Sequence, residues 1–201
     1  MAVANQTELA QAFADRGWRV TRDETSQPCG ELRVGDRVLL AILSKRSPTF
    51  AFHLGGWITT DALSVAYTVI FHPRKRVAES VPLVSSPEIS IAREIASDED
   101  IDGACAAWIT FAHEADLDAG MAVLLDKEAR PLGSGNAMHL SALAATGGVE
   151  VLAGYAEALA QGDRLGFVNY ITAEHIAAAL AFAQRRRDEP GWLPRSPRLR
   201  V

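Results

Sequence analysis

Cysteine is scarce in this chain, whose 201 residues contain only Cys29 and Cys105. Two cysteines outside any CxxC pair exclude a disulfide framework and favour a reducing compartment. No apolar run approaches the roughly 18 residues that span a bilayer. The first residues also lack the basic segment followed by an apolar one that marks a signal peptide. We therefore expect a cytoplasmic protein without a membrane partner.

Basic residues do not outnumber acidic ones. Lys and Arg number 20 against 25 Asp and Glu, which gives a net charge of −5. This balance argues against a nucleic-acid partner and favours a cationic one. With 48% hydrophobic and 22% charged residues, the composition is that of a folded globular chain.

Recognisable catalytic motifs are absent as well. HEADLD, which begins at His113, has Leu117 where a zinc-protease helix needs its second histidine. GSGN, which ends at Asn136, lacks the Lys-Ser/Thr of a phosphate-binding loop and instead predicts a turn with Asn136 as the next helix's N-cap. No G-x-S-x-G elbow occurs. We predict no catalytic residue, no cofactor-binding residue and no metal ligand.

Apolar residues tend to alternate before about residue 95, which is typical of strands, with Gly35-Asp36 as a hairpin turn. Ser64 to His72 is the clearest alternating run, with Val65 and Tyr67 on one side. A short helix is predicted over 7–16. The predicted strands cover residues 17–23, 31–43 (the hairpin), 49–54, 64–72 and 88–94.

After residue 95, alanine-rich spacing of three and four predicts helices. They are expected at 98–115, 118–127, 136–146, 149–161 and, after Thr172, 173–187. The sequence therefore predicts an α+β protein, with an N-terminal antiparallel sheet and one short helix packed against a C-terminal all-helical half. Three parts are expected: an α+β subdomain (1–95), a helical subdomain (96–189) and an extended Pro/Arg-rich tail (190–201). The favoured interpretation is that the tail folds back over the acidic region with Trp192 and Leu193 packed on the core, and the alternative is that it binds nucleic acid or a membrane surface.

The stretch SDEDIDG, which starts at Ser97, begins as a calcium loop would. Such a loop needs a bidentate Glu at its twelfth position, which here is Ile109. Ser97 and Asp100 have the spacing of a capping box. Ile101, Cys105 and Trp108 already follow helical spacing, so the stretch is predicted to start a helix.

Acidic residues dominate the segment around this helix. A solvated face is one interpretation, and a docking surface for a basic protein is the other. The predicted partner-binding residues are Glu94, Asp98, Glu99, Asp100, Asp102, Glu114, Asp116 and Asp118.

Three functions remain open. We expect a small acidic protein that binds another, basic protein, most simply a bacterial immunity-type protein that occludes a toxin. A secretion chaperone for an effector is the first alternative, and would bind an extended segment. An enzyme is the second, and would bring two or more histidines together with carboxylates in a pocket. The histidines are His53, His72, His113, His139 and His175.

Overall fold

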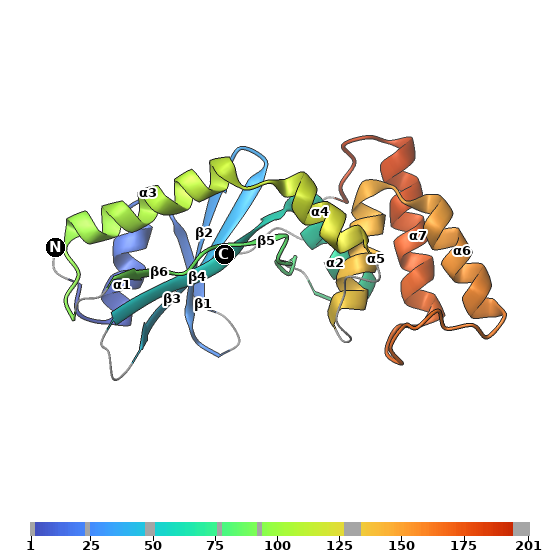
Figure 1. Ribbon diagram of the computed structural model, residues 1–201, viewed down its shortest axis with the longest axis horizontal. Helices are drawn as coiled ribbons and strands as arrows, with labels where there is room; N and C mark the ends of the chain where they lie inside the picture. Colours follow the sequence, from blue (N-terminus) through green and yellow to red (C-terminus); the bar gives the residue numbers. More distant parts are fainter. Residues whose placement is uncertain are drawn as a thin grey trace. The chain divides into compact units, whose positions relative to one another are not determined.

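The computed structural model describes residues 3–22, 25–46, 51–75, 78–91, 94–126 and 134–194. An antiparallel sheet occupies the first half of the sequence and helices fill the second, which confirms the predicted α+β class (Figure 1). The strands are β1 (Arg19–Arg22), β2 (Pro28–Val34), β3 (Arg37–Arg46), β4 (Ala51–Thr60), β5 (Val84–Ser85) and β6 (Ile89–Ile91). The helices are α1 (Gln6–Ala14), α2 (Asp61–Phe71), α3 (Asp98–Glu114), α4 (Leu117–Leu125), α5 (Ser134–Thr146), α6 (Val149–Ala160) and α7 (Ala173–Asp188).

The chain divides into two compact units that interleave in sequence. The sheet unit comprises Met1–Thr60 and Pro82–Asp116, and the helical unit comprises Asp61–Val81 and Leu117–Arg200. These units differ from the boundary predicted near residue 95, because α2 belongs to the helical unit and α3 to the sheet unit. The change of pattern at residue 95 follows secondary structure, whereas the units follow which elements pack together.

The sheet has the order β1-β2-β3-β4-β5, and β6 also pairs with β4. Every pairing is antiparallel. The predicted hairpin is confirmed: Val34 pairs with Arg37, and Gly35 takes a φ of 62° in the turn between them. Glycine suits this turn because a positive φ costs it no steric strain.

One face of the sheet carries the core of the sheet unit under α1 and α3. Alternate residues of β3 and β4 are fully buried there, as the period of two requires. Phe13, Trp18 and Trp108 form an edge-to-face chain above them, with ring centroids 5.2 and 6.1 Å apart. Gly56 makes room for that chain, because a Cβ there would lie 1.8 Å from the Leu40 carbonyl oxygen and 2.7 Å from the Trp108 ring.

The strand predicted over Ser64 to His72 is wrong, since α2 occupies this segment. Residues of both alternating sets are buried, Val65 on one side and Ala66 and Ile70 on the other. A helix that packs on several sides against α5 and α7 is apolar at most positions. Alternation among mostly apolar residues therefore did not distinguish a strand from a buried helix.

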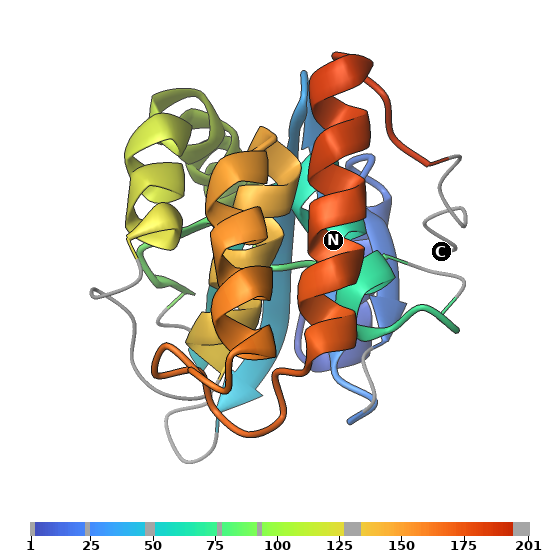
Figure 2. The ribbon, with the colours of Figure 1, turned by 90° about the vertical axis from the view of Figure 1, so that its right-hand side faces the viewer.

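The helical unit packs α2 and α4–α7 around a core rich in alanine. Figure 2 shows α6 and α7 side by side. As predicted, Thr172 caps α7 and glycines 147 and 148 separate α5 from α6. Trp192 packs its ring 5.3 Å from Phe182, and Leu193 also lies against this core, which confirms the packing expected of the tail's start. Residues 195–201 lie outside the described ranges.

None of the helices within the described ranges is both long enough and apolar enough to cross a membrane.

Candidate functional site

The start of α3 is a complete capping box. The Asp100 amide donates to Ser97 Oγ (3.2 Å), and the Ser97 amide donates to Asp100 Oδ2 (2.8 Å). These bonds satisfy amide groups that a helix start otherwise leaves unpaired. The predicted helix start is confirmed, and the position at which a calcium loop would need Glu, Ile109, lies inside the helix.

Two further acids of this segment tie α3 to α1. Arg16 Nη2 lies 2.9 Å from Asp98 Oδ1, and Arg16 Nε lies 2.5 Å from Asp102 Oδ1. Hydrogen bonds to Asp102 and then to Asp98 raise the pKa of the Arg16 guanidinium above its usual value. Glu94 and Glu99 are exposed and form no ion pair within the described ranges.

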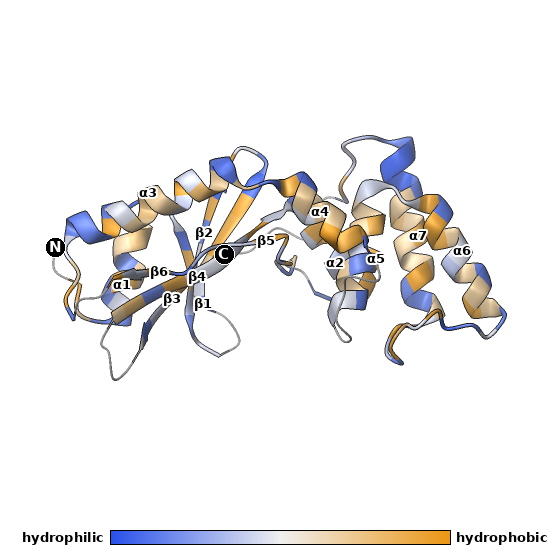
Figure 3. Cartoon of the chain, viewed as in Figure 1, coloured by the Kyte–Doolittle hydropathy of each residue, from blue (hydrophilic) through white to orange (hydrophobic). Residues whose placement is uncertain are grey.

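The structure divides the predicted acidic residues into separate groups. At 1.5 Å per residue, the 17 residues of α3 span roughly 25 Å. Glu114 and Asp116 lie at its far end, and Asp118 belongs to α4 of the helical unit. Figure 3 shows hydrophilic residues at both ends of α3. The structure brings together five residues, which we call the α3 acidic start: Glu94, Asp98, Glu99, Asp100 and Asp102.

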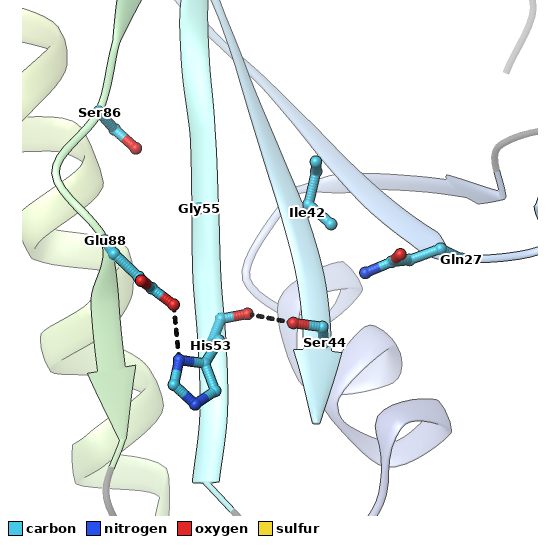
Figure 4. A pocket seen from close by; sticks show the side chains of 7 residues that line it. All are labelled: Gln27, Ile42, Ser44, His53, Gly55, Ser86 and Glu88. Carbon is cyan, nitrogen blue, oxygen red and sulfur yellow. Dashed lines mark hydrogen bonds and ion pairs between the residues drawn. The ribbon is translucent and has the colours of Figure 1, made fainter. Parts of the chain in front are cut away.

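A hollow of about 550 Å³ opens on the other face of the sheet (Figure 4). Gly55 forms its floor, because a Cβ there would meet no atom within 4 Å. Opposite Gly55, the chain between β5 and β6 leaves the regular ladder, and it places Ser86 and Glu88 at the rim. The hollow therefore results from a glycine in a central strand and an irregular segment in its neighbour.

The polar groups of this hollow centre on His53. Its Nδ1 donates to Glu88 Oε1 at 2.6 Å, and Ser90 Oγ lies 3.3 Å from the same nitrogen. Ser44 Oγ donates to the His53 carbonyl (3.0 Å). Ser86 Oγ is buried without a hydrogen-bond partner in the described structure, well away from the His53 ring (Figure 4). This hollow can hold a small polar group or a side chain. Because Nδ1 carries the proton that it donates to Glu88, it does not serve as the base that would activate the Ser90 hydroxyl.

A second hollow, of about 410 Å³, lies in the helical unit between the end of α2 and the start of α7. His72 and His175 both line it. His72 Nε2 lies 3.1 Å from Glu79 Oε2, and His175 Nδ1 accepts the Thr172 amide in the α7 cap (3.2 Å). Two histidines thus line one hollow and a carboxylate contacts one of them, which is part of what the enzyme alternative requires.

Two tyrosines, Tyr67 and Tyr170, complete this second hollow. Burial raises the pKa of both phenols above the usual value, and for Tyr67 the neighbouring Tyr170 adds to the effect. Both phenols are therefore neutral hydrogen-bonding groups at physiological pH. They are suited to binding a polar ligand and unsuited to acting as phenolate bases.

His139 has a structural role in the core of the helical unit. Its Nδ1 lies 3.0 Å from the Leu124 carbonyl oxygen, which only accepts, so Nδ1 donates and Nε2 accepts from the Tyr155 hydroxyl at 3.0 Å. The prediction that Asn136 caps α5 is wrong. The helix begins earlier, at Ser134, and the buried Asn136 accepts the Val168 amide through Oδ1 (3.1 Å).

Comparison with known proteins places the chain in a family. A family of unknown function, DUF6990, matches residues 5–184. The chain belongs to DUF6990. No curated protein and no solved structure matches it. The DUF6990 match includes segments of both the sheet unit and the helical unit.

In this DUF6990 chain, sequence reasoning missed both hollows. The glycine pair 55–56 inside an apolar run was the available signal for the first, because glycine within a strand marks a bulge or a close approach. The second had no local signal, since His72 and His175 come from distant segments. Within the described ranges, no three His, Cys, Asp or Glu side chains gather where they could hold a metal ion.

Proposed function

We propose that this protein binds another protein with a basic surface and acts as a cytoplasmic, immunity-type protein that occludes a toxin. Contact with a basic active-site cleft would block the toxin sterically and electrostatically. A single-signed surface also speeds encounter with an oppositely charged partner and disfavours partners of like charge.

The α3 acidic start is the observation that supports this function. Arg16 offsets only part of its negative charge, because one guanidinium faces the two carboxylates of Asp98 and Asp102. The Lys45 ammonium lies at the same end of the unit, where it donates to the carbonyls of Ala4 and Glu94. Among the described residues here, five carboxylates accompany two cations, and exposed Glu94 and Glu99 form no ion pair with either of them.

The experiment is a capture at low salt from a lysate of the cells that make the protein, followed by mass spectrometry. Wild-type protein should retain a basic partner that is released by salt and whose own activity it blocks. The double reversal Glu94→Lys with Glu99→Lys should weaken this complex by at least about tenfold, because it replaces attraction with repulsion. It leaves the capping box and the Arg16 pairs in place.

The matched control is Glu157→Lys with Glu174→Lys, which changes net charge equally on the helical unit. This control should retain the partner. If the two double variants bind the partner equally, the acidic start does not direct binding and the proposal is wrong.

A secretion chaperone for an effector is the second candidate. It is favoured by the open edge of β6, where a partner strand could pair, because β6 pairs with β4 and with no other described strand. A chaperone would bind an unfolded partner, whereas an immunity protein binds a folded one, which can still offer an exposed extended segment to a strand edge. Binding that survives urea denaturation of the isolated partner would favour the chaperone.

A further inference from the structure

The edge of β6 faces a hollow of about 390 Å³ that separates it from α3. Ile89, Ser90 and Ile91 form one wall, and Glu99, Asp100 and Gly103 lie on the other. Figure 1 shows β6 running beside α3 over this length. A strand edge presents backbone groups that can pair with another chain, so this hollow borders a surface able to accept a strand.

Gly103 keeps this hollow open. Glycine within a helix costs about 1 kcal/mol relative to alanine, and Gly103 stands in the second turn of α3. A Cβ at Gly103 would meet no atom within 4 Å, so packing inside the protein does not require glycine there. Because Gly103 has no side chain, the surface of α3 has a depression beside the strand edge.

Carboxylates flank this edge on both sides. Glu88 lies with His53 and Ser90 on the sheet face that α3 does not cover. Glu99 and Asp100 lie on the α3 side. Successive side chains of an added strand point to opposite faces, so two consecutive basic residues would meet Glu88 on one side and Glu99 or Asp100 on the other.

The opposite edge of the sheet carries basic residues instead of acidic ones. The edge strand β1 carries Arg19 and Arg22. Glu31 lies 3.6 Å from Arg19 and offsets its charge, whereas Arg22 would repel a basic segment. Charged residues on an edge strand also discourage pairing in general. The two edges therefore differ in the segment that they favour.

We infer that the β6 edge binds an extended segment of the partner that carries consecutive Lys or Arg residues, by adding it as a strand. The inference rests on the proposed function and names the part of the partner that is recognised. Backbone hydrogen bonds to β6 supply affinity, and the carboxylates on both sides supply selectivity.

The probe is an eight-residue peptide in which Lys-Lys pairs alternate with threonines, labelled for fluorescence anisotropy at low salt. N-methylation of two adjacent central residues removes the amide donors on both edges and keeps every charge. It should weaken binding by about tenfold, as expected for the loss of two hydrogen bonds. A peptide with the same number of lysines, all on one face of the strand, should also bind more weakly.

Two substitutions of one residue complete the experiment. Gly103→Leu should weaken binding by at least about tenfold, because the side chain fills the hollow. Gly103→Ala adds only a Cβ in open space and should bind the peptide like the wild type. Circular dichroism on both variants checks that α3 remains folded.

The outcomes separate this inference from the proposed function. If the methylated and unmethylated peptides bind equally well, strand addition is wrong. If that binding is then lost in the double variant Glu94→Lys with Glu99→Lys, the acidic surface is retained as the binding site. Binding sensitive to methylation and to Gly103→Leu but unaffected by charge reversal and salt would overturn the requirement for basic residues. If neither peptide binds, the inferred edge site is wrong, and the capture experiment still decides the proposed function.

Discussion

The sheet unit and the helical unit fill their interiors in opposite ways. Between the sheet and its two helices lie the large rings of Phe13, Trp18 and Trp108. The core of the helical unit instead contains many alanines, with α5 buried on nearly every side. Large side chains need a residue without a side chain opposite them, whereas small side chains let helices approach closely. A single added carbon should therefore harm the first unit most, and the loss of a buried hydrogen-bonded side chain should harm the second most.

The largest effect is expected from Gly56→Ala. Its Cβ would overlap the Leu40 carbonyl and the Trp108 ring, and neither the strand nor the buried indole can move far. We expect a loss of more than about 4 kcal/mol of unfolding free energy, at the extreme of single substitutions. Near-ultraviolet circular dichroism and urea unfolding would measure it.

The neighbouring Gly55→Ala is the matched control, since its Cβ meets nothing within 4 Å. It should unfold within about 1 kcal/mol of the wild type. Comparable losses for the two variants would show that the aromatic chain does not need bare backbone at residue 56.

A smaller loss is expected in the helical unit for His139→Ala. It removes a buried ring and leaves the Leu124 carbonyl and the Tyr155 hydroxyl without their shared partner. The cost should be about 2–3 kcal/mol, from the cavity and the unpaired groups together. Tyr155→Phe removes one of the two contacts and should cost about 1 kcal/mol. Thermal unfolding of the two variants would test this order, and an equal cost would contradict the bridging role of His139.

Ion pairs should show a weaker contrast between the units. Arg16 joins α1 to α3 through two carboxylates and is mostly buried, whereas Arg187 joins α7 to Glu150 through one and is half exposed. Arg16→Met should cost about 1 kcal/mol, and Arg187→Met should cost close to nothing. Urea unfolding at low and at high salt would measure both, and the Arg16 effect should shrink as salt rises. An equal cost for the two would mean that the α1–α3 tie adds nothing.

The least disruptive comparison uses the two cysteines of the sheet unit. Burial raises the pKa of the Cys105 thiol, so less of it is the reactive thiolate at any given pH. Cys29 is only partly buried. We expect iodoacetamide at pH 8 to modify Cys29 in the folded protein and to reach Cys105 only in denaturant, as read by mass spectrometry. Prompt modification of Cys105 without denaturant would contradict the tight packing of α3.

Local rules were enough to predict much of this structure. Ser97 and Thr172 identified helix starts because a capping side chain acts on the next three residues, and Gly35-Asp36 identified a hairpin for the same local reason. α2 was missed because its surroundings, α5 and α7, decide its conformation, and they come from later in the chain.

The candidate site was predictable only in part. The acidic residues and the capping box of Ser97 and Asp100 were evident from the sequence, but the Arg16 pairs that occupy Asp98 and Asp102 were not. The hollow beside β6 needed the sheet order, which places a three-residue strand at an edge next to α3. Pairing between distant segments is not encoded in any short stretch.

The interleaving of the two units also has a consequence during protein synthesis. α2 emerges from the ribosome long before the last of its partners, because ~100 residues separate its end at Phe71 from the start of α7 at Ala173. At typical elongation rates of about 5–20 residues per second, that delay is roughly 5–20 s. During this interval the apolar α2 lacks the last of the helices that cover it, while the sheet unit is completed at Asp116. The nascent chain is therefore most vulnerable to aggregation at the stage when its first unit is already able to fold.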